Sequence, residues 1–420
     1  MKKTNIPARI SRFEKLGFGL FLHYGVYSLA EAGEWIRHFR GMPYDEYSRL
    51  AGKFKAEEFD ARAIARLARE AGMRYACLTT RHHDGFSLYD TCGLDSFDAP
   101  RSAARRDLVS EFVEGCRAEG VVPFFYHTLL DWRWETETCT NEKFEEYLDY
   151  LHASVEILCC NYGKIGGLWF DGSWSRPGGN WKEDRLYATI RRHQPEAIIV
   201  NNTGLEARGA SGHPEIDSTT YEQGLPSLPD RSGHAKYLAA EMCETLNGHW
   251  GSAKWDFRFK GPATIIENLC ACRKVGANYL LNVGPGPTGK IGDYESALLR
   301  LVGRWIADTD RVLYEGIPVA SAACSGRDFI LQTGSRFFYF AHDLVRIGSQ
   351  HVVADGGGNG RRTVKHPPCK IDSICWLDDR SEVPFRLCED DGVLTLDCAG
   401  YDYGADRVVR VAEITPSASA

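Results

Sequence analysis

Several polar side chains of this 420-residue chain stand directly after short apolar runs, and Asp171 is the clearest case. It follows Leu168-Trp169-Phe170 and precedes Gly172. A carboxylate in that place either caps the turn after a strand or serves as a nucleophile that the strand holds rigidly. In glycoside hydrolysis such a nucleophile works with a second, protonated carboxylate that assists the leaving group, and the gap between the two decides the stereochemistry.

Further polar residues share this position at the carboxyl end of an apolar run. They are His23, His82, His83, Asp84, Tyr126, His127, Asn201 and Asn202. In a parallel β/α barrel the carboxyl ends of the strands converge on one rim, where such enzymes carry their catalytic groups. The shared position therefore predicts one site that is built from several strands.

The adjacent pair His82-His83 has three interpretations. Successive residues of a strand point to opposite faces, so both rings reach one metal ion only if the backbone bends there. With Asp84 close by, two imidazoles at a rim suit hydrogen bonding to a ring of hydroxyl groups. In the third interpretation one ring is buried and the other lies in solvent. We expect neither a metal ion nor a cofactor.

The pair Glu34-Trp35 follows the first apolar run, in a segment that does not have the pattern of a helix core. A tryptophan in such a loop is more exposed than packing alone prefers. Its ring could form the floor of a sugar site while the glutamate binds hydroxyl groups.

The elements that must position these residues alternate between apolar runs and helix-period segments, as in parallel β/α units. The predicted strands are Phe18–His23, Tyr75–Thr80, Val121–His127, Gly167–Asp171, Ala197–Asn201, Ile216–Thr220, Tyr237–Glu241 and Tyr279–Val283. Amphipathic helices are predicted over Ala61–Ala71, Leu108–Ala118 and Phe144–Cys160. Because eight strands suffice to close a barrel, the sequence predicts an α/β protein with a (β/α)8-like TIM barrel.

After Pro318 the pattern changes to short alternating stretches between Gly and Asp clusters, which is typical of antiparallel β-structure. The stretches are Phe329–Gln332, Phe337–Ala341 and Val408–Ile414. We therefore expect a barrel over residues 1–315 and a small antiparallel β domain over residues 316–420. The glycine-rich segment 355–360 is interpreted as a surface loop, because no strand-to-helix transition surrounds it.

Composition excludes some classes of partner. The net charge is -7 and the basic residues are dispersed, which argues against nucleic acid and against an anionic membrane surface. No window approaches the roughly 18 uninterrupted apolar residues of a membrane span. Aromatic residues make up 12% of the chain, and flat rings of this kind cover the apolar face of a sugar. A neutral or weakly polar substrate is expected.

The 14 cysteines are scattered, without the regular spacing of a disulfide scaffold or a paired CxxC zinc framework. Cys270-Ala271-Cys272 falls in a helical pattern and is attributed to packing. Met1-Lys2-Lys3 is not followed by the apolar stretch and cleavage site of an export signal. These features lead us to expect reduced thiols and a cytoplasmic location. The sequence does not give the oligomeric state, and a homo-oligomer is compatible with it.

Several segments, in order along the chain, resemble the signature of the family 29 glycoside hydrolases, the α-L-fucosidases. They are Phe18–Ser28, Gly33-Glu34-Trp35, Leu78–Phe86, Leu130-Asp131-Trp132, Trp169–Gly172, His249-Trp250-Gly251 and Gly276–Pro285. The resemblance spans roughly residues 15 to 315. Several motifs in register are far more specific than any one of them.

The resemblance implies a barrel followed by a β-sandwich, and release of terminal α-linked L-fucose from a fucosylated oligosaccharide or glycoconjugate. The reaction would pass through a covalent fucosyl-enzyme with retention, and Asp171 matches the nucleophile of the family. The residues expected around the sugar are His23, Glu34, Trp35, His82, His83, Tyr126, Trp169, Glu241 and Trp250. Two alternatives stay open: a catalytically silent fucose-binding barrel, and a barrel glycosidase for a related sugar.

Three glutamates compete for the acid/base role that the resemblance implies. Glu222 resembles the family's Asp-x-x-Thr-x-Glu pattern and is preferred, whereas Glu215 fits a different loop alignment. Glu241 matches another family glutamate, which usually follows a tryptophan; here Ala240 stands in that place. The acid needs a raised pKa, which an apolar neighbour or repulsion from Asp171 could supply.

A further departure from the family pattern lies after the fifth predicted strand. Thr203 stands where many members carry an arginine that contacts the sugar. The loss of one charge-assisted contact costs about 1.5–3 kcal/mol and leaves the nucleophile in place. It therefore bears on substrate detail more than on reaction type.

Overall fold

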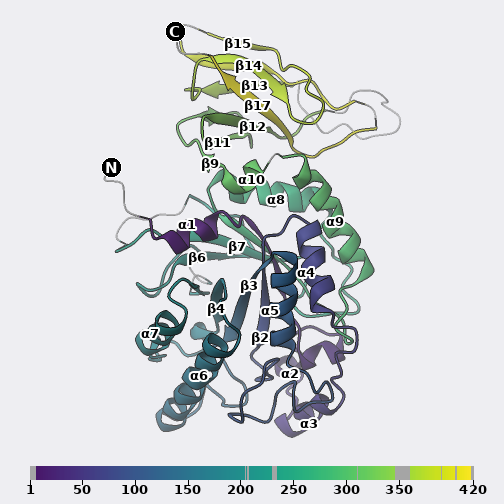
Figure 1. Ribbon diagram of the computed structural model, residues 1–420, viewed down its shortest axis with the longest axis vertical. Helices are drawn as coiled ribbons and strands as arrows, with labels where there is room; N and C mark the ends of the chain where they lie inside the picture. Colours follow the sequence, from purple (N-terminus) through teal and green to yellow (C-terminus); the bar gives the residue numbers. More distant parts are fainter. Residues whose placement is uncertain are drawn as a thin grey trace. The chain divides into compact units, whose positions relative to one another are not determined.

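The computed structural model describes residues 6–203, 205, 208–228, 234–309, 311–345, 360–388, 390–402 and 404–417 (Figure 1). The chain packs as two compact units. The first comprises Met1–Lys260 with Ala277–Arg300, and the second comprises Gly261–Gly276 with Leu301–Ala420. The expected division into domains at residue 315 stays a prediction. Most of the glycine-rich segment 355–360 lies outside the described residues.

Eight parallel strands close into a barrel in the order of the chain, which confirms the predicted fold. They are β1 Phe18–Leu22, β2 Tyr75–Arg81, β3 Val122–Thr128, β4 Gly167–Asp171, β5 Ile198–Asn201, β6 Ser218–Glu222, β7 Ala239–Thr245 and β8 Asn278–Val283. Strand β8 pairs back with β1, where Phe18 lies opposite Tyr279. Each strand overlaps one of the predicted runs.

Strands β6 and β7 begin two residues later than predicted. Directly before β6, the buried carboxylate of Asp217 accepts hydrogen bonds from Arg9 at 3.0 Å, Arg191 at 2.6 Å and Lys236 at 2.9 Å. This cluster of ion pairs stands at the start of the strand. Strand β6 ends at Glu222, so this carboxylate lies at the carboxyl rim of the barrel.

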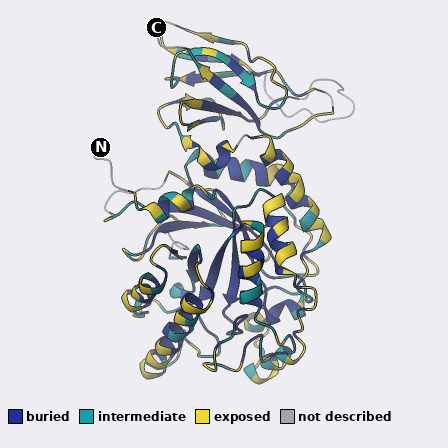
Figure 2. Ribbon diagram, in the orientation of Figure 1, coloured by how far each residue is buried: buried dark blue, intermediate teal, exposed yellow. Residues whose placement is uncertain are grey.

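The outer faces of the helices are exposed, whereas the barrel strands are buried almost throughout (Figure 2). The helices of the first unit are α1 Ala8–Glu14, α2 Ile36–Phe39, α3 Tyr44–Ser48, α4 Ala61–Glu70, α5 Leu108–Glu119, α6 Asn141–Asn161 and α7 Glu183–His193, with short 3-10 turns η1 Val26–Ala30, η2 Arg49–Gly52 and η3 Ser173–Ser175. Asp60, Asp107 and Thr140 cap α4, α5 and α6 by accepting a backbone N–H from the first turn. The three predicted helices are thereby confirmed.

Aromatic side chains fill the barrel interior. One buried cluster runs from Phe13 and Phe124 to Tyr126 and Trp169. Gly19 is required at its place, because a Cβ there would lie 2.4 Å from the ring of Tyr75. Among the described residues no helix is long and apolar enough to cross a membrane.

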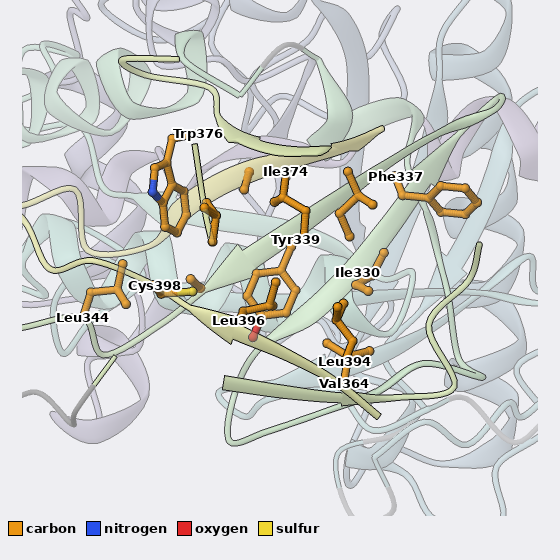
Figure 3. Packing of buried hydrophobic residues seen from close by; sticks show 14 of the residues in the cluster. Ile330, Phe337, Tyr339, Leu344, Val364, Ile374, Trp376, Leu394, Leu396 and Cys398 are labelled. Carbon is orange, nitrogen blue, oxygen red and sulfur yellow. The ribbon is translucent and has the colours of Figure 1, made fainter. Parts of the chain in front are cut away.

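The second unit contains two antiparallel sheets, in the orders β10-β13-β16-β15 and β14-β17-β12-β11-β9. The strands are β9 Ile317–Pro318, β10 Ala323–Cys324, β11 Phe329–Thr333, β12 Arg336–Ala341, β13 Arg361–Lys365, β14 Ile371–Trp376, β15 Phe385–Leu387, β16 Val393–Asp397 and β17 Arg410–Pro416. Tyr339 and Trp376 of one sheet pack with Val364, Leu394 and Leu396 of the other (Figure 3). This core confirms the predicted β-sandwich.

Helix α8 Pro262–Lys274 also belongs to the second unit, α9 Asp293–Ala307 runs from the first unit into the second, and α10 Val312–Glu315 follows. Cys270 and Cys272 are both buried on α8, as expected for packing residues. At the end of α9 the indole of Trp305 donates a hydrogen bond to the carbonyl of Val409 at 2.9 Å.

Candidate active site

A cavity of about 210 Å³ opens at the carboxyl ends of the barrel strands. Its lining residues are Phe21, His23, Trp35, His82, His83, Tyr126, Trp169, Asp171, Trp174, Leu205, Glu222 and Trp250. The volume lies below the roughly 300–1,000 Å³ of sites for drug-sized ligands, so the cavity suits one small ring. Of the residues predicted at strand ends, His23, His82, His83, Tyr126 and Asp171 line this cavity, whereas Asp84, His127, Asn201 and Asn202 are not among its lining residues.

Asp171 is the last residue of β4, and three donors orient its carboxylate. The indole of Trp174 donates to Oδ1 at 3.1 Å, Asn202 Nδ2 lies 3.3 Å from the same oxygen, and the hydroxyl of Tyr126 donates to Oδ2 at 3.1 Å. The chain turns at Gly172, which has φ +97° and where a Cβ would lie 2.5 Å from Leu130. A strand with a tight glycine turn thus holds the carboxylate at the cavity.

Glu222 faces Asp171 from the end of β6, and Asn202 connects the two. Asn202 Nδ2 donates to Glu222 Oε2 at 2.6 Å, and the hydroxyl of Thr220 donates to Asn202 Oδ1 at 2.9 Å. The second bond fixes the orientation of the amide, so that its N–H groups point at both carboxylates. Two acids from different strands are thereby held around one nitrogen atom.

The surroundings of Glu222 favour its protonated form. Burial raises the pKa of Glu222 to about 7, the negative charge of Asp171 adds to the increase, and the hydrogen bond from Asn202 opposes it. Near neutral pH this carboxyl group therefore exchanges a proton readily. An acid/base catalyst has this property.

The three histidines of the cavity are neutral at physiological pH. Burial lowers the pKa of His23 to about 3 and that of His83 to about 4, and it lowers the pKa of His82 well below its usual value. His23 Nδ1 lies 2.6 Å from Asn282 Oδ1, an acceptor, so the proton is on Nδ1 and Nε2 is left as an acceptor. Neutral imidazoles suit an uncharged, hydroxyl-bearing ligand.

His82 and His83 both line the cavity, although they are adjacent in sequence. Strand β2 ends at Arg81, and its pairing with β3 shifts between Thr79 and Arg81, so the alternation of a regular strand does not apply beyond it. His83 Nε2 lies 3.5 Å from Asp171 Oδ2. Within the described ranges, no group of three or more His, Cys, Asp or Glu side chains is arranged to hold a metal ion.

Aromatic rings form the walls. Tyr126 stacks between His82 and Trp169, with ring centroids 5.5 and 5.7 Å away, and Trp250 lies 5.0 Å from His23. Trp35 stacks on Trp174 at 6.1 Å. Such flat faces pack against the C–H groups of a sugar ring or a methyl group.

Glu34 and Glu241, which were predicted to contact the substrate, are not among the residues that line the cavity. Glu34 is buried and its carboxylate accepts the backbone N–H of Gly251 at 2.7 Å, which ties together two loops of the rim. Glu241, also buried, accepts from Tyr75 at 2.6 Å and from the indole of Trp169 at 2.9 Å. Glu241 therefore supports Trp169 from the barrel interior, and contact of either glutamate with substrate stays a prediction.

The structure separates the candidates for the acid/base. Glu215 precedes β6 and accepts a hydrogen bond from Arg191 at 3.0 Å, at the opposite end of that strand from Glu222. Glu241 lies within β7, and burial raises its pKa to about 7 as well. Of the three, Glu222 is the one that lines the cavity with Asp171.

Sequence reasoning assigned no individual role to Phe21, Trp174 and Leu205, which line the cavity, or to Asn202, which donates to both carboxylates. Asn202 had been noted at a strand end, and Trp174 follows Asp171 by only three residues, so position was the available signal for both. Thr203, which stands in place of the arginine, accepts a hydrogen bond from the backbone of Gly212 at 3.2 Å.

A carboxylate and a protonated carboxyl group that face each other across a sugar-sized cavity can hydrolyse a glycosidic bond. Fold and site together therefore define a barrel glycoside hydrolase. The family model of alpha-L-fucosidase matches residues 2–310, and the chain belongs to that family.

Individual relatives agree with this assignment. The tissue alpha-L-fucosidase of Mus musculus is 28% identical over 334 residues, which cover 73% of this chain and 72% of the mouse protein. The structure of alpha-L-fucosidase isoenzyme 1 from Paenibacillus thiaminolyticus is similar with a TM-score of 0.82 and 30% identity, over 98% of this chain and 99% of that chain. An alpha-L-fucosidase from Bacteroides thetaiotaomicron, with a trapped covalent intermediate, shares the fold at a TM-score of 0.80 and 18% identity, over 99% of this chain and 98% of that one.

Proposed function

We propose that this enzyme releases terminal α-linked L-fucose from oligosaccharides or glycoconjugates by double displacement with retention of configuration. Asp171 acts as the nucleophile and Glu222 as the acid/base. The observation that carries the proposal is the amide of Asn202, which reaches both carboxylates at the cavity. A panel of fucosylated oligosaccharides tests it: free L-fucose should appear, and a panel that stays intact would contradict it.

The first step forms the covalent intermediate. An oxygen of Asp171 attacks the anomeric carbon while the bond from this carbon to the leaving oxygen breaks, and the proton of Glu222 passes to that oxygen. In the second step Glu222, now a carboxylate, takes a proton from water, and the water oxygen attacks the same carbon. This breaks the bond to Asp171 and restores both groups.

The separation of the two acids supports retention. Asn202 Nδ2 lies 3.3 Å from Asp171 Oδ1 and 2.6 Å from Glu222 Oε2. The distance between these two oxygens cannot exceed the sum of the two hydrogen-bond lengths. That sum is shorter than the roughly 6.5 Å at which the separations of inverting pairs begin. Retaining pairs stand roughly 5–5.5 Å apart. A structural relative is consistent with retention, since the Bacteroides thetaiotaomicron enzyme was trapped as a covalent intermediate.

Recognition of fucose is attributed to neutral groups. The available Nε2 of His23 accepts a hydrogen bond from a hydroxyl group, and His82 and His83 offer further imidazole nitrogens at the cavity. Within the described part of the chain, His82 Nδ1 is buried without a hydrogen-bond partner. A buried polar atom of this kind is costly unless a ligand satisfies it, so we assign it to a sugar hydroxyl.

The pH dependence of the first step follows from Glu222. Its raised pKa of about 7 means that the proton is present below that pH and is lost above it. We therefore expect kcat/KM for fucosides with poor leaving groups to fall as the pH rises through about 7. Steady-state kinetics at a series of pH values measure this limb, and a limb that persists in Glu222→Gln would assign it to another group.

A variant of Asn202 provides a second test of this pH dependence of kcat/KM. Its hydrogen bond stabilises the charged form of Glu222, so Asn202→Ala should raise the pKa of Glu222 and move the limb to higher pH. The matched control is Thr203→Ala, which removes a hydroxyl bonded to Gly212 one residue further along the same loop. The control should keep the wild-type limb; equal movement in both variants would count against the bridge.

We also propose that the protein works in a reducing compartment such as the cytoplasm. All fourteen cysteines lie in the described residues and none is paired. Burial raises the pKa of Cys159 to about 12 and that of Cys77 well above its usual value, which keeps both as thiols. Denatured, freshly purified protein should react with a thiol reagent at all fourteen positions, and a deficit of two or more would oppose the proposal.

A further inference from the structure

Two large aromatic side chains stand in solvent on the loop that follows β7. Trp255 is 78% exposed and Phe257 is 75% exposed. Their ring centroids lie 6.2 Å apart at an angle of 75°. Single exposed apolar residues are ordinary, but two adjacent rings that contact each other in water form a patch of the kind that marks a binding surface.

The loop that carries these rings is held firmly. Between them, the side chain of Asp256 is only 4% exposed and accepts hydrogen bonds from the backbone of Gly248 at 2.6 Å and of Arg258 at 3.0 Å. His249 Nδ1 lies 2.7 Å from the same carboxylate. A fixed backbone reduces the entropy lost on binding, so the rings are presented in advance of a ligand.

The same loop forms part of the wall of the catalytic cavity. Trp250, which precedes the two exposed rings on this loop, lines the cavity. The backbone N–H of Gly251 donates to Glu34 at 2.7 Å, and that of Lys254 donates to the carbonyl of Glu31 at 2.8 Å. Glu34 and Glu31 both belong to the segment after β1, which contributes Trp35 to the wall of the cavity. The exposed rings therefore follow directly on residues fixed to the rim.

A second loop of the rim repeats this arrangement. Phe39 is 79% exposed, and its ring centroid lies 5.8 Å from that of Trp35, a wall residue. Leu205, which lines the cavity from the loop after β5, is 40% exposed. Exposed apolar side chains are thus placed on three of the loops that frame the cavity.

The size of the cavity determines what must lie at this rim. About 210 Å³ suits one sugar ring, so the part of the substrate attached to fucose extends past the rim. An indole or phenyl face binds the C–H face of a pyranose. Lys254 Nζ lies over the indole of Trp255, 5.6 Å from the ring centroid. The ammonium group occupies one face of the indole, and the rest of the ring is left to solvent.

From these observations we infer that Trp255 and Phe257 form an aglycone site that binds the neutral pyranose to which fucose is linked. The inference rests on the proposed function and names the substrate class of the same site. It makes the enzyme selective for fucose that is attached to another sugar, through packing rather than through charge.

The test compares two substrates that differ in their leaving group. A fucosyl disaccharide presents a pyranose to the rim, whereas α-L-fucosyl fluoride presents a single atom. In Trp255→Ala and Phe257→Ala we expect KM for the disaccharide to rise about tenfold, the factor for losing one packed ring, with kinetics on the fluoride unchanged. Tyr294→Ala is the matched control, because this ring is also exposed, at 55%, and packs on Phe259 instead.

Other outcomes would overturn the inference. Unchanged KM for the disaccharide, or equal losses on both substrates, would show that the rings do not select the aglycone. A change of sedimentation coefficient in step with the loss would make the patch a contact between copies of this chain. Calorimetry on the Asp171→Asn variant distinguishes failure of this inference from failure of the proposed function. Adding Trp255→Ala should weaken disaccharide binding about tenfold and leave L-fucose binding intact, whether or not turnover follows the proposed mechanism.

Discussion

Replacing Asp171 by alanine is expected to lower kcat for an aryl α-L-fucoside on the order of 10⁴-fold or more, because no covalent intermediate can form without the carboxylate. Steady-state assays at saturating substrate measure the loss. Asp171→Asn is the matched control for folding, since it keeps the shape of the side chain and its place near Trp174 and Tyr126. It should bind L-fucose and still fail to turn over.

External azide distinguishes a lost nucleophile from a damaged cavity. In Asp171→Ala the small anion can enter the space of the carboxylate and attack the anomeric carbon, which should restore release of the aryl group and yield a fucosyl azide of inverted configuration. Full activity of the variant without azide would refute the assignment of Asp171.

Replacing Glu222 by alanine is expected to have the second largest effect, and that effect depends on the substrate. For a fucosyl disaccharide the leaving oxygen needs a proton, so kcat/KM should fall about 10²–10⁴-fold. For an activated aryl fucoside, whose leaving group needs little protonation, the fall should be far smaller. Comparing kcat/KM of the two substrates in the variant and in the wild type measures this difference.

The matched control for this prediction is Glu215→Ala, at the other end of the same strand. It removes a partner of Arg191 far along β6 from the cavity and should leave the ratio of the two substrates unchanged. If Glu222→Ala also left the ratio unchanged, the acid/base role would pass to another residue.

The barrel itself could be predicted from the sequence because each strand is a short apolar run that its loops separate clearly. Periodicity failed by two residues at β6 and β7, where it extended the runs back to Ile216 and Tyr237. The ion pairs of Asp217 stand at that end of β6 and are formed by residues up to 208 positions away. Partners so distant in sequence cannot be detected from the local hydrophobic periodicity.

Asp171, the histidines and most aromatic residues of the cavity could be recognised from motifs, whereas the link between Asp171 and Glu222 could not. The bridge of Asn202 depends on the register in which β4, β5 and β6 pair, which brings Asp171, Asn202 and Glu222 within hydrogen-bonding distance. That register is a property of the closed sheet. The same register places Glu215 and Glu222 at opposite ends of a strand, which sequence spacing alone left open.

The adjacent histidines illustrate a rule applied outside its range. Alternation of faces holds within a strand, so the residues alone allowed both His82 and His83 to reach one point only if the backbone bends there, whereas the family resemblance placed both at the sugar. Strand β2 ends at Arg81, so both rings enter the cavity with centroids 4.2 Å apart.

The configuration of the first sugar released tests the central claim most directly. Proton NMR of a fucoside mixed with enzyme follows the anomeric signal before mutarotation mixes the two forms. Two carboxylates joined by the amide of Asn202 predict that α-L-fucose appears first and β-L-fucose only later. Initial appearance of β-L-fucose would mean that water attacks the substrate directly, and it would contradict Asp171 as the nucleophile.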